Sequence, residues 1–296
     1  MNAKMLFLSA VSVVLIILIS SISLLYTNNG EPSTIVSQYG NPIEIYGDGI
    51  YKNDSAFLAP IFKGTDLIML IVTAPLATWF ILEHKRKKSF ASALNLASVN
   101  FVIFYYAVSL SFGVIYNALH LLYIVLLSTS FFSILLGFIH IQNTYLKTYT
   151  PCFYPSKGLN AFLIISATAL FVAWLPDIIV SLINQKPLSY LENYTTSVTN
   201  VLDMGFISPL LFLSVYLLKK HNFYGVYLLA CLLFLSSLIG IILPSQTIFQ
   251  IANGINIPFG ELITKVAIFV VLSAIAFYYR RRLFKSLKPE TYYFEE

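Results

Sequence analysis

The feature that most constrains this chain is a series of eight long apolar runs. A transmembrane helix needs roughly 20 predominantly apolar residues, and ordinary soluble domains carry about a quarter charged residues. This chain of 296 residues is 58% hydrophobic and only 10% charged, so most of its surface must face lipid. The sequence therefore predicts an all-α, polytopic transmembrane bundle of about eight spans, forming one integral membrane domain over residues 1–296. The predicted spans are 5–26, 66–83, 91–114, 119–141, 159–183, 201–218, 222–243 and 259–279.

The basic residues gather at every second span boundary, in clusters at 85–88, 219–220 and 280–285. The opposite loops hold only three lysines, which are Lys52, Lys63 and Lys186. This positive-inside pattern predicts a cytoplasmic (inner) membrane protein with both termini in the cytoplasm. Orientation and contact with anionic membrane lipid explain the net charge of +5, so no nucleic-acid partner is expected.

The first span resembles a secretory signal, because Lys4 precedes an apolar stretch over residues 6–26. The apolar part is about 20 residues long, against 7–15 in a signal peptide, and no small-x-small cleavage site is clear. We therefore predict a retained helix.

The longest polar segment, residues 27–65, falls between the first two spans on the predicted outer side. It is rich in Gly, Pro, Asn, Tyr and Ser, which is typical of structured turns, and we expect it to cap the outer face. Asp48 and Asp54 could bind a cation, but they lack the regular ligand spacing of a calcium loop. A turn with solvated acids is the favoured interpretation, and no metal site is predicted.

Two inward-running spans share a pattern that indicates a possible four-plus-four parallel repeat. One is predicted to start at Asp66 and contains Pro75, the other to start at Asp203 and contains Pro209, and both end in basic residues. Transporters often use such repeats and place the site between the halves. The alternative is that any inward-running helix starts polar and ends basic.

The acidic residues inside or at the edge of the spans all map to the predicted outer end. Intramembrane carboxylates are costly and therefore point to a functional site. A histidine and a lysine reach the same level. The predicted ligand-binding or ion-binding set is Asp66, His120, Asp177, Asp203, Glu261 and Lys265.

Each member of this set also has a simpler interpretation. Asp66 and Asp203 stand near predicted helix N-termini, where capping is the favoured role of a carboxylate. Asp177 differs, because it lies near a helix C-terminus, where the helix dipole disfavours an anion. It therefore needs a cation or a donor, such as Lys265 or His120, and is the most informative of the acids.

Glu261 and Lys265 have the i, i+4 spacing of a helical ion pair, with the glutamate first. A structural salt bridge that neutralises the lysine is the simpler alternative to a binding role. His120 could relay protons or bind a metal, but a single histidine is more often a satisfied polar residue.

Catalytic signatures are absent from the sequence. It contains no Gly-x-Ser-x-Gly, His-Glu-x-x-His, phosphate loop or Cys-x-x-Cys. No catalytic residue and no cofactor are therefore predicted, and a role other than catalysis is favoured.

Three short motifs resemble an uncharacterised family of prokaryotic multipass membrane proteins. They are Tyr-Gly-x-Gly-x-Tyr-x-x-Asp over residues 46–54, Gly-Thr-Asp at 64–66, and Leu-Asp-Met-Gly at 202–205 with Pro209. Asn117, followed by Leu-Leu-Tyr at 121–123, adds to the resemblance. The resemblance implies the architecture of about eight helices. It implies no activity, and no catalytic residue is carried over from it.

Three functional hypotheses follow. The first is a transporter or ligand-binding membrane protein whose outward-facing acidic pocket takes a small cationic solute or a proton, with the segment 27–65 as a lid. The second is a membrane-embedded enzyme that acts on a lipid or polyprenyl head group, with His120 in an acid–base pair. The third is a structural or assembly subunit in which the polar cluster only specifies helix packing.

Overall fold

The computed structural model describes residues 2–145, 153, 155–188 and 190–287, with the side chains of Glu261 and Lys265 left aside. Within these residues, eight helices are long and apolar enough to cross a membrane. The protein is thus an all-α, multipass membrane protein, as predicted. In chain order the elements are α1 (Asn2–Leu25), β1 (Ser33–Val36), β2 (Pro42–Ile45), α2 (Leu58–Ile68), the π-helical η1 (Met69–Thr73), α3 (Ala74–Lys87), α4 (Phe90–Gly113), α5 (His120–Thr144), α6 (Lys157–Asn184), α7 (Val198–Leu202), the π-helical η2 (Asp203–Ile207), α8 (Ser208–Lys219), α9 (Phe223–Ala252), α10 (Phe259–Glu261), the π-helical η3 (Leu262–Ala267) and α11 (Ile268–Ser286).

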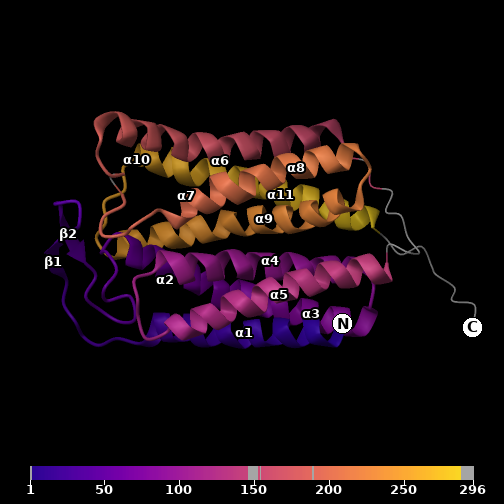
Figure 1. The fold of residues 1–296 in the computed structure, drawn as a ribbon, viewed down its shortest axis with the longest axis horizontal. Coiled ribbons are helices and arrows are strands. Elements are labelled where there is room, and N and C mark those ends of the chain that lie inside the picture. The colour runs from indigo at the N-terminus through magenta and orange to yellow at the C-terminus, as the bar shows by residue number, and fades with distance from the viewer. Residues whose placement is uncertain (1, 146–152, 154, 189, 288–296) are drawn as a thin grey trace, which may run out of the picture.

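The helices form two layers, which we call the first bundle (α1–α5) and the second bundle (α6–α11) (Figure 1). In the first bundle α4 packs against α3 and α5, and α1 closes the ring against α5 and α2. In the second bundle α6 packs against α8, α8 against α9, and α9 against α11. Consecutive spans are therefore neighbours in both bundles. The short strands β1 and β2 lie at one end of the molecule, which we call the strand end, and the N-terminus lies at the other, the basic end.

The second span starts earlier than predicted. Its helix begins at Leu58, with Pro60 in the first turn, where a missing N–H costs nothing. The loop predicted over 27–65 therefore ends at Phe57. The sixth span likewise begins at Val198 rather than at residue 201. Neither Asp66 nor Asp203 is an N-cap, so the capping interpretation of both residues was wrong.

The same backbone break occurs in both of these spans. The residue before each proline donates its N–H five positions back, from Ala74 to the Met69 carbonyl in η1 and from Ser208 to the Asp203 carbonyl in η2. Proline cannot donate and its ring crowds the preceding turn, and the wider π turn accommodates it.

Aligning the two breaks corrects one detail of the predicted repeat. With Ala74 placed on Ser208, Asp66 corresponds to Asn200, and Asp203 corresponds to Met69. The prolines match, but the two aspartates lie three residues apart, which is nearly one helical turn.

The bundles meet mainly where α9 packs against α2 and α4. A Cβ atom added to Gly64 would lie 2.6 Å from the Cα atom of Gln246, so the backbones of α2 and α9 are in close contact there. The Ser245 hydroxyl donates to the Gly64 carbonyl (2.7 Å) and the Gln246 amide to the Thr65 hydroxyl (2.8 Å). At the basic end, the Arg280 guanidinium of α11 donates to Asn95 of α4 (2.6 Å).

Candidate functional site

Asp66 is fully buried inside the first bundle and accepts three hydroxyl hydrogen bonds. The Tyr106 hydroxyl donates to Oδ1 (2.5 Å), the Tyr51 hydroxyl donates to Oδ2 (2.7 Å), and the Ser23 hydroxyl also donates to Oδ2. These donors come from α4, from the loop before α2, and from α1. Asp66, Tyr51 and Ser23 are each 0% exposed. The carboxyl group is therefore held in closed polar surroundings, and none of the described residues bonds a cationic group to it.

Asp203 lies on the other side of α4, within the break of the sixth span. Its two oxygens accept from the Tyr105 hydroxyl of α4 (2.9 Å) and from the indole N–H of Trp174 of α6 (3.0 Å). Asp203 is 8% exposed, and the indole is only partly buried. The carboxyl group thus lies where α4, α6 and η2 meet, rather than within one bundle.

A partly buried aromatic pair links Asp203 to Asp177. The Trp174 and Tyr190 rings lie 6.2 Å apart, and the Tyr190 hydroxyl accepts from the Asn200 amide (2.8 Å). Burial raises the pKa of Tyr190, and the charge of the nearby Asp177 raises it further. Asp177 is half-buried on α6. Two carboxyl groups and two aromatic rings therefore surround one region at the strand end, which we call the aromatic–acidic site (Asp203, Asp177, Trp174, Tyr190 and Tyr105).

The other predicted site residues are placed differently. The His120 ring lies 5.2 Å from the ring of Tyr116, and the described contacts join it to no carboxyl group. Glu261 and Lys265 lie on α10 and η3, but their side chains fall outside the described residues. Of the six predicted residues, the structure thus brings Asp177 and Asp203 toward one region and places Asp66 in a separate one.

The cap at the strand end has a buried core of its own. Asp54 is 0% exposed, and its Oδ1 accepts from the Tyr194 hydroxyl (2.8 Å) and the Ile115 N–H (2.9 Å). Burial raises the pKa of Asp54 to about 7, although both hydrogen bonds lower it. The predicted solvated turn is thus wrong for Asp54. Asp48 is different, since its carboxylate accepts from the Thr27 hydroxyl, which lowers its pKa.

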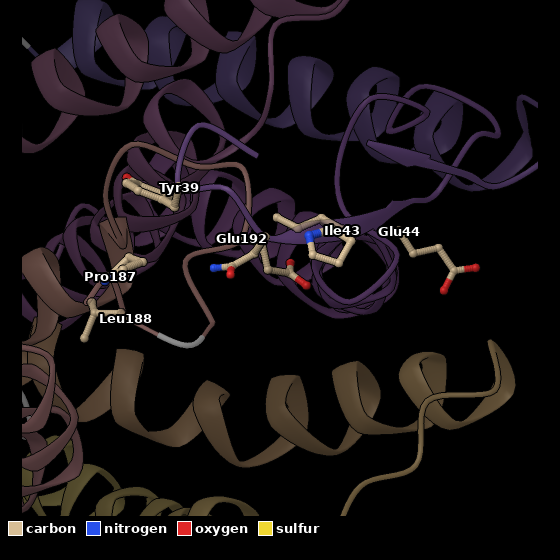
Figure 2. Close-up of a pocket in the computed structure, with 8 residues that line it drawn as sticks. Tyr39, Ile43, Glu44, Pro187, Leu188 and Glu192 are labelled. Carbon is tan, nitrogen blue, oxygen red and sulfur yellow. The ribbon is translucent and has the colours of Figure 1, made fainter. Parts of the chain in front are cut away.

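Tyr194 joins the loop after α6 to the loop before α2. The Tyr194 hydroxyl donates to Asp54, and the Tyr194 carbonyl oxygen accepts from the Gln38 amide (3.0 Å) and the Tyr39 hydroxyl (3.1 Å). Figure 2 shows Tyr39 and Ile43 of the segment before α2 near Pro187 and Glu192 of the loop after α6, around a pocket. The cap therefore consists of both loops, whereas the sequence predicted only the first.

The site and cap residues that were not predicted carried only weak signals in the sequence. Tyr51 and Asp54 belong to the Tyr-Gly-x-Gly-x-Tyr-x-x-Asp motif, and Gly47 within it adopts φ 84°. A Cβ atom there would lie 2.1 Å from the Glu31 carbonyl oxygen, so the turn requires glycine. Nothing in the spacing of Tyr194 or Trp174 marks either residue as a partner of an aspartate.

No protein-family model, curated protein or solved structure matches this chain.

Proposed function

We propose that this multipass membrane protein binds and transports a small organic cation, which it takes up at the aromatic–acidic site from the side of the membrane that faces the strand end. The observation that carries the proposal is the placement of the Asp203 carboxyl group. It lies at a helix break between the bundles, next to partly exposed aromatic rings, with a second carboxyl group close by.

The chemistry of the site fits a cationic ligand in two ways. Carboxylates form strong charge-assisted hydrogen bonds with ammonium groups, and the faces of Trp and Tyr attract cations. Because the Asp203 carboxyl group is held by two donors rather than three, it keeps acceptor capacity for a ligand N–H.

The architecture supports movement of the ligand across the membrane. Transporters commonly place their binding sites at discontinuous helices between two repeats, and alternate access by rocking one repeat against the other. Here both bundles carry a proline-associated π break in their second span. The clustering of basic residues at the other end predicts, by the positive-inside rule, that the strand end faces outward and both termini face the cytoplasm.

The test is a ligand screen by thermal unfolding of the purified protein in detergent, using primary, quaternary and aromatic amines. We expect at least one amine to raise the unfolding temperature of the wild type. Asp203→Asn keeps the size of the side chain and removes its charge, and we expect it to weaken that amine at least about tenfold. Asp48→Asn, in the exposed part of the cap, is the matched control and should bind as the wild type does. Uptake of the same amine into proteoliposomes then tests transport.

Two results would overturn the proposal. One is a panel in which no amine stabilises the wild type. The other is an amine that binds Asp203→Asn and Asp177→Asn as tightly as the wild type, since the two carboxyl groups would then be packing elements.

A further inference from the structure

A chain of hydroxyl groups connects Asp66 to the loop between α4 and α5. The Tyr51 hydroxyl donates to Asp66 (2.7 Å), and the phenol groups of Tyr51 and Tyr123 lie close enough to interact electrostatically. The Tyr123 hydroxyl accepts from the side-chain amide of Asn117 (3.2 Å), which lies half-buried in the loop at the strand end. Tyr51 and Tyr123 are 0% and 1% exposed. The chain therefore runs through the protein interior from the strand end to the carboxyl group.

The surroundings of Asp66 suit a proton better than a larger ligand. The side chain is fully buried, and three hydroxyl groups already occupy its oxygens. A solute or a hydrated ion would have to displace these donors, whereas a proton needs no added volume. The titratable groups around Asp66 are Tyr51, Tyr106, Tyr123 and Lys63. The ammonium group of Lys63 donates to the Tyr46 hydroxyl (3.1 Å) rather than to Asp66.

Tyr106 provides an alternative hydrogen bond for the protonated state. Its hydroxyl donates to Asp66 and also lies 3.4 Å from the Ser20 hydroxyl, where either atom could donate. A proton on Oδ2 of Asp66 can donate to the Tyr51 oxygen. A proton on Oδ1 can donate to the Tyr106 oxygen, and Tyr106 can then turn its own O–H toward Ser20, which accepts instead of donating. Protonation at either oxygen therefore needs only hydroxyl rotations.

An apolar layer lies on the other side of Asp66. Ile16, Met69 and Ile103 are each 0% exposed and lie about one turn closer to the basic end than Ser20, Asp66 and Tyr106, respectively. Beyond this layer, polar contacts between helices resume with the hydrogen bond of Ser12 to Thr129 (2.9 Å) and that of Asn100 to Ser9 (2.9 Å). Ser12 is eight residues from Ser20, which is about 12 Å along α1.

We propose that Asp66 is a proton-binding site that exchanges its proton with the strand end through Tyr51 and Tyr123. A proton that arrives at the Tyr123 oxygen displaces the Tyr123 proton to Tyr51. The Tyr51 proton passes to Asp66, which becomes a neutral carboxylic acid. The apolar layer separates Asp66 from the basic end in this conformation. The inference deepens the proposed function, since it supplies a coupling ion, but its test needs no solute.

Infrared spectroscopy of the protein in lipid nanodiscs tests the site directly, because a protonated carboxyl group has its own carbonyl stretching band. We expect a component of this band that grows in as the pH is lowered in the wild type, is missing from Asp66→Asn, and is retained in Asp203→Asn and in Asp54→Asn, which removes the signal of the buried Asp54 carboxyl group. After a rapid pH jump, Tyr123→Phe should slow the growth of this band at least tenfold. Tyr216→Phe removes a hydroxyl from an exposed tyrosine of α8 and should leave the rate unchanged.

The proposal is overturned if the wild type shows no such band at any pH at which it is folded, or if Asp66→Asn retains it. An unchanged rate in Tyr123→Phe refutes the hydroxyl route, and this variant decides the matter alone if Asp66→Asn does not fold. Amines are absent from these samples, so the failure of amine binding and the failure of proton exchange remain separate results.

Discussion

Each bundle holds a buried aspartate in its second span, but the two aspartates have different surroundings. In the first bundle, Asp66 lies three residues before the π turn and accepts only from hydroxyl groups of its own bundle and cap. In the second bundle, Asp203 is the first residue of the π turn and bonds to α4 of the other bundle and to an indole of α6. A shift of three residues rotates a helical side chain by about 60° and moves it by about 4.5 Å along the axis.

This difference separates two kinds of chemistry that a single helix break can support. The carboxyl group that faces the interior of a bundle is closed off and suits a proton. The one that faces the contact between bundles can gain and lose neighbours when the bundles move. Adjacent residues of α4, Tyr105 and Tyr106, donate to one carboxyl group each, so α4 connects the two sites.

The largest expected effect is on stability, when each carboxyl group is removed in turn. Asp66→Ala leaves three buried hydroxyl groups without their acceptor, and at 1–3 kcal/mol for each buried polar group left unsatisfied we expect a loss on the order of 5 kcal/mol. Asp203→Ala leaves two donors, of which Trp174 is only partly buried, and should cost about half as much. Unfolding in detergent by added denaturant measures both. Equal losses would mean that the two surroundings do not differ energetically.

The second effect is a dependence of the protein's stability on pH, caused by the buried Asp54 of the cap. The pKa of Asp54 is about 7 in the folded protein, against a usual 3.8. Because the folded value is the higher one, its contribution to stability is full below about pH 4 and is lost as the pH rises through about 7. At about 1.4 kcal/mol per pKa unit, the total is about 4 kcal/mol. We therefore expect the wild type to unfold more easily at about pH 8 than at about pH 5.

Two variants test whether Asp54 is the cause. Asp54→Asn cannot ionise and should remove most of this dependence, which unfolding curves across the same pH range would show. Asp48→Asn affects a carboxylate of the same loop whose pKa is lowered, so it should leave the loss at high pH intact. A wild type whose stability is flat between these pH values would contradict the assignment.

Much of the fold could be predicted because hydropathy depends on local sequence. Eight apolar runs gave eight helices, and the pairing of Pro75 with Pro209 pointed to a feature that the two halves share. The helix starts were missed for a physical reason. The first eight residues of α2, from Leu58 to Thr65, include Lys63, Gly64 and Thr65, which lower the local hydropathy. They are nevertheless helical, and α2 packs against α9.

The candidate site was predicted only in part, because hydrogen-bond partners depend on tertiary packing. The cost of burying a carboxyl group singles out Asp66, Asp177 and Asp203 from sequence alone. Their donors come from other elements, since Tyr106 is 40 residues from Asp66 and Trp174 is 29 residues from Asp203. No local pattern encodes such pairings, and the burial of Asp54 beneath Tyr194, 140 residues away, was missed for the same reason.

The smallest effect we predict is a difference in stability between two glycine variants, one in each of the two spans that contain a proline-associated π turn. A Cβ atom added to Gly64 would meet the backbone of α9 at 2.6 Å, and backbone cannot move aside as a flexible side chain can. Gly64→Ala should therefore force α2 away from α9 and destabilise the protein by about 1–3 kcal/mol. Gly205, in η2, has nothing within 4 Å of the corresponding Cβ position and provides the matched control. Gly205→Ala should be neutral, or more stable by up to about 1 kcal/mol, because alanine restricts the unfolded chain.

Denaturant unfolding of both variants in one detergent measures the difference. If Gly64→Ala were as stable as Gly205→Ala, the close contact between α2 and α9 would not hold the two bundles together. The second span of the first bundle would then be as free to move as that of the second bundle.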